Sequence, residues 1–456
     1  MILPTRALPP EPPPPGLATT LRAVCARVLM VTCLTVICAP LWPLYLGLRA
    51  VYGRPPHVAP LRVHLRWLRA ALRRHPALPL RAQLLVVLGL LASMVSVPLL
   101  GLAWLLDELL EGAALDEVHI VAPIFELSAA RSGSTQLAHI LEEDPRVVAP
   151  SLARMLVPYR WAWRIARRPL VARHLLPRAE AAFLGLLPAE YIARHELDLR
   201  HTDTFEVWFY GQRGGGLVPY LGEQTMTEEF GAHASTPASA PLWEEDLVNY
   251  LQRLGQKLLL DLGPAAGPRH LMVKGHFLAS APALAARFPD ARFVTVLRAP
   301  LPRLQSCLNF MRLQPGDPAL PPRPWAWVRH FGLGAQVPYN ELERRWFTAA
   351  GGPVRVALPF RRFVDDLPGA LLLVFGAIFG DKELAPHLPR EHAPRERERY
   401  AINHSLEELG VDAAAVEAAS ADFTRWMRAL EAEGSARPVV AQPLATSGPP
   451  AGAPSA

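Results

Sequence analysis

The sequence predicts an α/β fold with a mainly parallel sheet flanked by helices, preceded by an N-terminal two-helix membrane hairpin. From residue 118 onward, short β-like runs alternate with helical runs, which is typical of parallel sheets joined by helical crossovers. Before that point, residues 28–47 and 84–106 form two apolar runs without a charged side chain. Each is long enough to cross a bilayer as a helix. The 51% apolar composition and mean hydropathy of +0.15 agree with membrane segments.

These patterns divide the chain into four parts. Residues 1–20 are proline-rich and expected to be disordered, as is the tail 437–456. Residues 21–115 form a membrane module, in which the apolar segments 28–47 and 84–106 flank an arginine-rich amphipathic loop. Residues 118–436 form the globular α/β domain.

The basic charge of the chain is concentrated in the loop between the apolar runs. The formal net charge is +6, and residues 48–83 carry eight arginines and no acid, so the charge indicates a membrane-flanking segment and not nucleic acid. Leu61, Leu65, Leu68 and Leu72 repeat at helical spacing beside arginines, which predicts a helix on an anionic membrane surface. A solvated connector is the alternative, and either reading favours the cytoplasmic side for this loop.

Two other readings of the apolar runs remain open. They could be buried core helices, or a re-entrant hairpin, because Pro40, Pro43 and Pro98 interrupt them. The cysteines indicate no further feature: Cys25, Cys33, Cys38 and Cys307 have neither disulfide-framework nor zinc-ligand spacing. We therefore expect no metal site.

Within the globular part, three segments read as strands. Residues 118–127 and 292–297 are the clearest, and 353–360 is weaker. Helical patterns follow each of them, at 136–141, 301–311 and 367–378. The helical stretch 145–190 is expected to be a cap over a site or a second membrane-facing surface. Acceptor specificity is expected to lie in residues 145–200 and in the insertion 312–350.

The stretch "SAARSGSTQL" (128–137) joins the first strand to its helix. Free N–H groups and the helix dipole make such a turn an anion-binding site, and the overall arrangement is P-loop-like. Gly133 lets the backbone approach a ligand, Ser132, Ser134 and Thr135 add hydroxyl donors, and Arg131 adds a charge suited to oxyanions. No Gly-Lys pair is present, so nucleoside-triphosphate chemistry of the kinase kind is disfavoured.

A second element follows the strand at 292–297. Arg298 ends that strand, and Ser306 lies eight residues later on the next helix. Because parallel strands present their carboxyl ends at one edge of the sheet, both loops should face the same ligand. Two anion-binding turns at one edge predict a ligand with two separated anionic groups.

These motifs resemble the sulfotransferases that use 3′-phosphoadenosine 5′-phosphosulfate (PAPS). "ARSGST" (130–135) is similar to the family's loop, and "RAP" (298–300) with Ser306 to its second element, except that Ala299 replaces an aspartate. "MVKGHFLASAPALAARFPDARFVTVLRAP" (272–300) tracks the text of one branch, with Gly275-His276 in place of its S-P. The resemblance covers about residues 120–412.

The resemblance implies roles for particular residues. Arg131, Ser132, Gly133, Ser134 and Thr135 would hold the 5′-phosphosulfate, and Arg298 with Ser306 the 3′-phosphate. Lys274 would contact the transferring group, with a less certain role for His276. Glu206 is the favoured base for the acceptor, with Asp203, His201 and His195 as rivals. Arg397 and Arg399, in the basic run 389–400, would close over the nucleotide.

The sequence thus predicts a membrane-anchored sulfotransferase that moves a sulfuryl group from PAPS, as donor substrate and without a metal, to a hydroxyl of a glycan, lipid or other acceptor. The alternative, kept open by Ala299, is a weakly active or inactive membrane-tethered PAPS-binding scaffold. An integral membrane protein is expected. Its catalytic domain would face the Golgi lumen in a eukaryote or the cytoplasm at the inner membrane of a bacterium.

Overall fold

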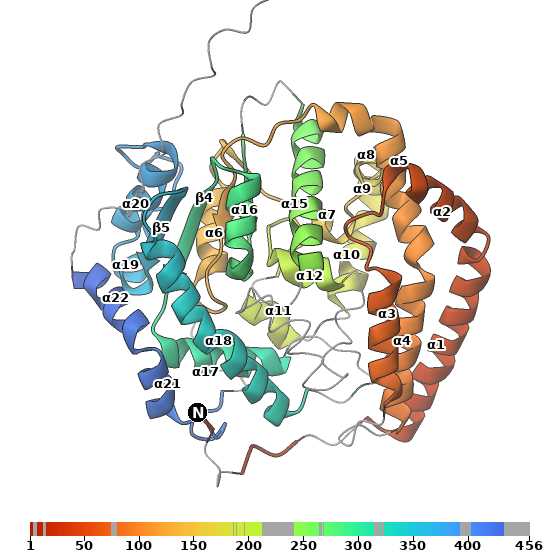
Figure 1. Ribbon diagram of the computed structural model, residues 1–456, viewed down its shortest axis with the longest axis horizontal. Helices are drawn as coiled ribbons and strands as arrows, with labels where there is room; N and C mark the ends of the chain where they lie inside the picture. The colour runs from red at the N-terminus through yellow and green to blue at the C-terminus, as the bar shows by residue number, and fades with distance from the viewer. Residues whose placement is uncertain are drawn as a thin grey trace, which may run out of the picture.

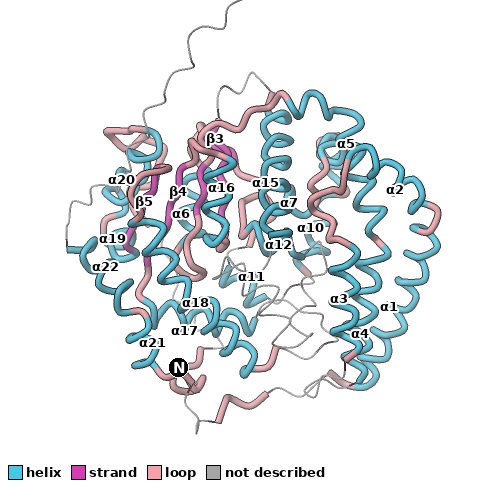
Figure 2. Tube along the Cα trace, in the orientation of Figure 1, coloured by secondary structure: helices cyan, strands magenta, loops and turns pink. Residues whose placement is uncertain are grey.

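The fold is that of a computed structural model, which describes residues 1–432 except 3–6, 12–14, 74–79, 186, 188, 196, 212–240, 264–266, 268, 314–319, 321–322 and 393–402. A five-stranded sheet in the order β2-β3-β1-β4-β5 lies at one end of the molecule, and a group of long helices lies at the other (Figures 1 and 2). All strand pairs are parallel. The predicted fold class of the globular part is therefore confirmed.

The strands differ from their predicted bounds in an instructive way. They are β1 (Ile124–Glu126), β2 (Val147–Val148), β3 (His270–Lys274), β4 (Arg292–Leu297) and β5 (Val354–Pro359). The strand predicted at 118–127 is only three residues long, because Ala122 has a φ of 44° and Pro123 offers no N–H to a ladder. The strand at 292–297 is confirmed to the residue. Strands β2 and β3 were not predicted.

Alternate residues of each strand face two different helical layers. On one face, Ile124, Met272 and Val294 pack with α6 (Ser134–Glu142), α19 (Phe360–Asp365) and α20 (Leu367–Phe379). On the other, Phe125 and Phe293 share a cluster with α15 (Pro241–Leu262), α16 (Ala281–Arg287) and α18 (Trp325–Thr348). Both faces of the sheet are thus covered by helices. A ligand site is therefore expected at the carboxyl ends of the strands, where the loops that follow them lie.

The remaining helices of the domain complete the cap and the C-terminal side. They are α7 (Leu152–Leu156), α8 (Arg160–Ala166), α9 (Pro169–His174), α10 (Leu176–Leu184), α11 (Ala189–His195), α12 (Phe205–Gly211), η4 (Leu278–Ser280), α17 (Pro300–Leu313), α21 (Ala413–Ala419) and α22 (Ala421–Ala432). The helices predicted at 136–141, 301–311 and 367–378 correspond to α6, α17 and α20. Helices α6 and α17 begin the connections from β1 to β2 and from β4 to β5, whereas α20 follows the last strand, after α19.

The described residues of the N-terminal module form five helices, where the predicted membrane hairpin had two. They are α1 (Leu17–Cys38), α2 (Leu41–Tyr52), α3 (Leu61–Leu72), α4 (Leu80–Val95) and α5 (Val97–Asp116). The apolar run 28–47 is divided between α1 and α2, which meet at Ala39-Pro40. In the described residues, 17–38 and 80–116 are long and apolar enough to cross a membrane by length and composition, which is weak evidence for a membrane anchor.

Parts of the proline-rich segment 1–20 contact the domain. Ile2 forms an antiparallel bridge with Val411, and the Glu11 carboxylate lies 2.7 Å from the Arg312 guanidinium. The tail 437–456 lies outside the described residues.

Candidate active site

The turn after β1 is shaped by two residues with left-handed backbone. Arg131 has a φ of 67° and Gly133 a φ of 94°, and Gly133 is the N-cap of α6. A Cβ at Gly133 would lie 3.0 Å from Cε2 of Phe360, so this glycine is required by both conformation and space. The strained arginine is notable because non-glycine residues at positive φ are concentrated at functional sites.

The turn after β1 meets the end of β4, as the sequence predicted. The Arg298 guanidinium donates to the Arg131 carbonyl oxygen at 2.7 Å, and Arg131 Nε donates to Ser306 Oγ at 3.1 Å. Each guanidinium also lies over an aromatic ring, Arg131 over Phe310 at 4.7 Å and Arg298 over Phe360 at 4.9 Å. The two predicted anion-binding elements therefore form one unit.

Buried polar groups hold the turn from beneath. Tyr339 of α18 donates its hydroxyl to the Leu127 carbonyl at 3.0 Å, and Glu343 of the same helix accepts from the Ala129 N–H at 3.2 Å. Glu126 ends β1 with no exposure and accepts from the Ser128 hydroxyl. Burial raises the pKa of Glu126 to about 7. These contacts fix the turn before any ligand arrives.

A cavity of about 340 Å³ opens over this turn. Its walls come from the turn and the start of α6, the ends of β3 and β4, α11, α17, α19 and the segment before residue 393. The lining residues are Ala130, Arg131, Gly133, Ser134, Thr135, Gln136, Arg194, His195, Lys274, His276, Arg298, Phe310, Phe360, Val364 and His392. No aspartate or glutamate is among them.

The positive charge of the cavity is not balanced by the described residues around Arg298. Burial lowers the pKa of the Arg298 guanidinium, and the neighbouring charges of Arg131 and Arg303 lower it further. No carboxylate of the described residues forms an ion pair with Arg298. A guanidinium with cationic neighbours and no paired carboxylate among the described residues favours the binding of an anion.

Hydroxyl and ammonium groups also lie at the start of α6. Lys274, at the end of β3, donates from Nζ to Thr135 Oγ1 at 2.9 Å. Ser132 is fully buried, and among the described residues its Oγ has no hydrogen-bond partner. Ser132 is not among the residues that line the cavity, whose wall is formed here by its neighbours Arg131, Gly133, Ser134 and Thr135.

A histidine–carboxylate pair, formed by His195 and Asp203, lies at the cavity. The Nε2 of His195 lies 2.8 Å from Oδ1 of Asp203, which also accepts from Trp208 Nε1 through Oδ2 at 2.9 Å. Burial by itself raises the pKa of Asp203, but His195 and Lys274 outweigh it and hold this pKa well below its usual range. Because Nε2 faces the carboxylate, Nδ1 is the ring nitrogen that remains for another partner.

Glu206, the favoured base, lies behind the cavity wall and not on it. Its Oε1 accepts from the His276 N–H at 3.0 Å, and burial raises its pKa to about 8. His276 lines the cavity and donates from Nδ1 to the Ser128 carbonyl at 2.7 Å, while burial and then Lys274 lower its pKa to about 3. At neutral pH these two groups are a carboxylic acid and a neutral imidazole.

The third rival, His201, lies elsewhere. With His139 and Glu142 it forms a group whose ligand atoms are all within 4.8 Å of one another. Glu142 already accepts from the Thr202 N–H at 3.2 Å, which explains the group as a clamp on α6. None of the three residues lines the cavity.

Several cavity residues were not predicted from the sequence. Arg194 and Phe310 line it beside Arg131, and Gln136 donates to Nδ1 of His392, whose Nε2 donates to the Phe363 carbonyl at 2.6 Å. His392 belongs to the run 389–400 that was expected to close over a nucleotide. Arg397 and Arg399 of that run lie outside the described residues.

Ala299 stands in an apolar setting. It packs against the cluster of Leu297, Phe423 and Met427, the last two from α22. Arg303, one turn later on α17, donates to Glu343 at 3.1 Å. The carboxylate that supports this region therefore comes from α18 and not from position 299.

Solved structures resemble the chain, whereas no family profile and no curated protein sequence matches it. The fold is similar to that of sulfotransferase STF9 from Mycobacterium avium, with a TM-score of 0.54 and 14% identity over 80% of this chain and 90% of that one. Sulfotransferase STF1 from Mycobacterium tuberculosis has a TM-score of 0.49 at 16% identity, over 83% of this chain and 98% of that one. The chain therefore has the fold of the sulfotransferases.

Proposed function

We propose that the protein is a PAPS-dependent sulfotransferase that acts on a hydroxyl of a glycan, lipid or other acceptor at a membrane. The observation that carries this proposal is the joined unit of Arg131, Arg298 and Ser306 beside a cavity whose described lining residues include several cations and no acid. A donor with two separated anionic groups matches these two elements. The Arg298 guanidinium, which has no paired carboxylate among the described residues, fits that donor.

The residues of the chain account for the steps of sulfuryl transfer. Arg131, Lys274 and the first N–H groups of α6 stabilise the negative charge that grows on the bridging oxygen as its bond to sulfur breaks. Arg298 and Ser306 hold the distant phosphate and thereby orient the donor. A base takes the hydroxyl proton of the acceptor as the new sulfur–oxygen bond forms.

Geometry favours His195 over Glu206 as that base. His195 lines the cavity and is oriented by an ionised Asp203, whereas Glu206 is off the wall with a pKa near 8. The orienting carboxylate keeps the imidazole in one tautomer and stabilises the imidazolium that forms on proton transfer.

Transfer of radiolabelled sulfate from PAPS to a panel of glycan and lipid acceptors tests the function, with Arg131→Ala as the inactive control. Incorporation of label that requires Arg131 supports it. Binding of the donor without turnover on any acceptor would instead favour the scaffold alternative.

A further inference from the structure

The loop between the two apolar runs lies on the same side as the catalytic domain. Arg54, just after α2, forms an ion pair with Asp246 of α15. His57 is 1% exposed and stacks on Trp104 of α5, with 4.7 Å between ring centroids, and on Tyr250 of α15 at 6.2 Å. A loop on the far side of a bilayer would be about 30 Å from these partners.

Helix α3 packs on α4, and the two belong to an apolar cluster that is continuous with the domain. Val63, Trp67 and Ala71 of α3 are buried in this cluster, which also contains Leu247 and Leu254 of α15. The predicted membrane-facing leucines are on the other side of α3, where Leu61, Leu65 and Leu72 are exposed. The arginine-rich helix therefore has one buried face and one open face.

The end of the second apolar run is fixed to the domain as well. Asp107 of α5 accepts from Lys257 Nζ at 2.9 Å and from the N–H groups of Arg160 and Trp161 at 2.8 and 3.1 Å. Arg253 of α15 pairs with Glu108. Helix α5 is thus a structural helix of the domain.

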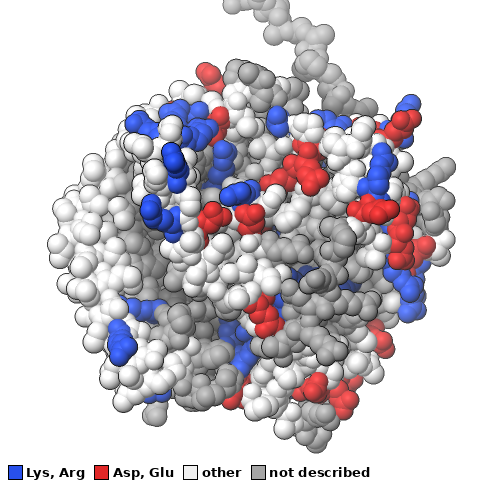
Figure 3. Space-filling model, turned by 180° about the vertical axis from the view of Figure 1, so that it is seen from behind, with Lys and Arg blue, Asp and Glu red and all other residues white. Residues whose placement is uncertain are grey.

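Helices α1 and α2 contrast with α4 and α5, because their outer faces are apolar and exposed. In α1 the most exposed apolar residues include Leu29 at 64% and Val36 at 71%. Helix α2 continues this surface with Leu44 and Val51. In Figure 1 these helices form the outer flank of the molecule, and the same flank carries no acidic side chain in Figure 3.

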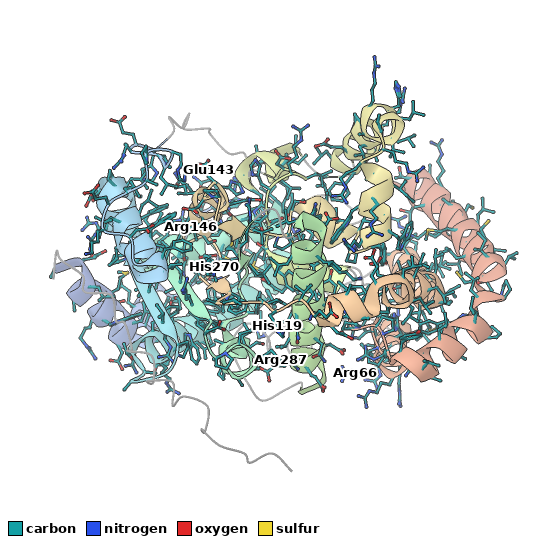
Figure 4. The ribbon with its side chains drawn as sticks, turned by 90° about the horizontal axis from the view of Figure 1, so that it is seen from above. Arg66, His119, Glu143, Arg146, His270 and Arg287 are labelled. Carbon is teal, nitrogen blue, oxygen red and sulfur yellow. The ribbon has the colours of Figure 1, made fainter. Side chains whose placement is uncertain are left out.

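The charge of this region matches an anionic lipid surface. Residues 12–106 contain no aspartate or glutamate, and their charged residues are arginines 22, 27, 49, 54, 62, 66, 69, 73, 74 and 81. Arg62, Arg66 and Arg69 are exposed on α3. Figure 4 places Arg66 at the periphery of the helical module. Exposed apolar surface beside arginines is typical of a protein face that contacts an anionic membrane.

We propose that the module binds one leaflet of an anionic membrane in its plane, through the outer faces of α1 and α2 and the arginines of α3, and that neither apolar run spans the bilayer. This inference rests on the membrane association in the proposed function and specifies its topology. The domain and the arginine-rich segment then share one side of the membrane.

Cysteine labelling in sealed membrane vesicles from expressing cells tests the topology. In a chain with Cys25, Cys33, Cys38 and Cys307 changed to alanine, Arg62→Cys on α3 and Arg428→Cys on α22 are treated in separate samples with an impermeant maleimide. In-plane binding predicts that both react from the same side. A spanning hairpin predicts that they react from opposite sides, which would overturn the proposal while leaving membrane association intact.

Flotation of the full-length protein with lipid vesicles gives a second measurement. Here the variants are made in the wild-type chain, with its cysteines retained. Mixed phosphatidylglycerol–phosphatidylcholine vesicles should float the protein, and pure phosphatidylcholine vesicles serve as the uncharged comparison. Leu29→Gln with Val36→Gln should weaken binding at least about tenfold. The exposed Val121→Gln is the matched control and should leave it unchanged. Arg62→Gln with Arg69→Gln should weaken binding roughly twenty-fold, and only with the anionic vesicles, whereas Arg428→Gln should not.

Two outcomes would overturn the proposal in other ways. If the protein floats with neither vesicle and instead dimerises through α1, a second copy covers this flank and membrane association itself fails. If α1 and α3 variants float like wild type, another surface binds the membrane. Sulfate transfer to a soluble acceptor, measured in parallel, reports on the proposed activity independently of all these results.

Discussion

The Arg298 guanidinium donates a 2.7 Å hydrogen bond to the carbonyl oxygen of Arg131, so the residue that follows β4 holds the turn that follows β1. The two strands are adjacent and parallel, in register from Ile124 opposite Arg292. The two turns therefore position each other, and a ligand bound by one of them lies next to the other. This coupling makes both arginines testable with a single ligand.

Arg298→Ala should weaken the binding of adenosine 3′,5′-bisphosphate by about ten- to a hundredfold, because a charge-assisted contact to phosphate is lost. Isothermal titration calorimetry measures this change. The exposed Arg428→Ala on α22 serves as the control for loss of a positive charge and should bind like wild type. Equal affinity of the Arg298 variant would remove the second element from the proposed site.

Gly133→Ala should destabilise the protein by about 1–3 kcal/mol, because the residue is held at a φ of 94° and its Cβ would press on Phe360. Gly334→Ala is the matched control: it is within α18 with open space around it, and it should stabilise the protein by about 0.5–1 kcal/mol. Urea unfolding followed by circular dichroism compares the two. A Gly133 variant as stable as wild type would contradict the geometry of the turn.

His195→Ala should lower kcat for sulfate transfer by about a hundred- to ten-thousandfold if this histidine is the base. Asp203→Asn should also lower kcat and change its pH profile, because the orienting carboxylate is lost. Glu206→Gln discriminates between the two candidates, since it keeps the acceptor for the His276 N–H. If Glu206→Gln lowers kcat as much as His195→Ala does, at unchanged stability, Glu206 is the better candidate for the base.

Glu206 should also make stability depend on pH. Its pKa is raised from 4.5 to about 8 in the folded protein, so the folded state binds more protons than the unfolded state between these values. The stability that it contributes is complete below pH 4.5 and is lost as pH rises to about 8. Glu206→Gln should flatten this part of the profile in thermal unfolding, and an unchanged slope would contradict the raised pKa.

The sequence predicted the parts of the site that depend on local order. The residues from Arg131 to Thr135 lie together because they are consecutive, and Arg298 and Ser306 are brought near them by parallel pairing of β1 and β4. The pairing of His392 with Gln136 joins positions 256 residues apart, and no local pattern marks it. Preference for His195 over Glu206 needed the cavity wall, which only the tertiary structure provides.

The limits of the fold prediction have similar causes. Residues 292–297 were predicted exactly because an apolar run is bounded by charged and proline-containing turns. Strand β3 ends in a buried lysine and β2 has two residues, so neither stands out by periodicity. Hydropathy could not tell whether the run 84–106 crosses a membrane or packs in a protein core, since both require an apolar helix.

The buried Lys257 has a practical consequence for anyone who trims the chain to obtain a soluble fragment. Its ammonium is fully enclosed, paired with Asp107 and set 3.4 Å above the ring of Trp104. A truncation that starts at Val118 would delete both partners and strip one side of α15. Preparations should therefore retain the N-terminal helices.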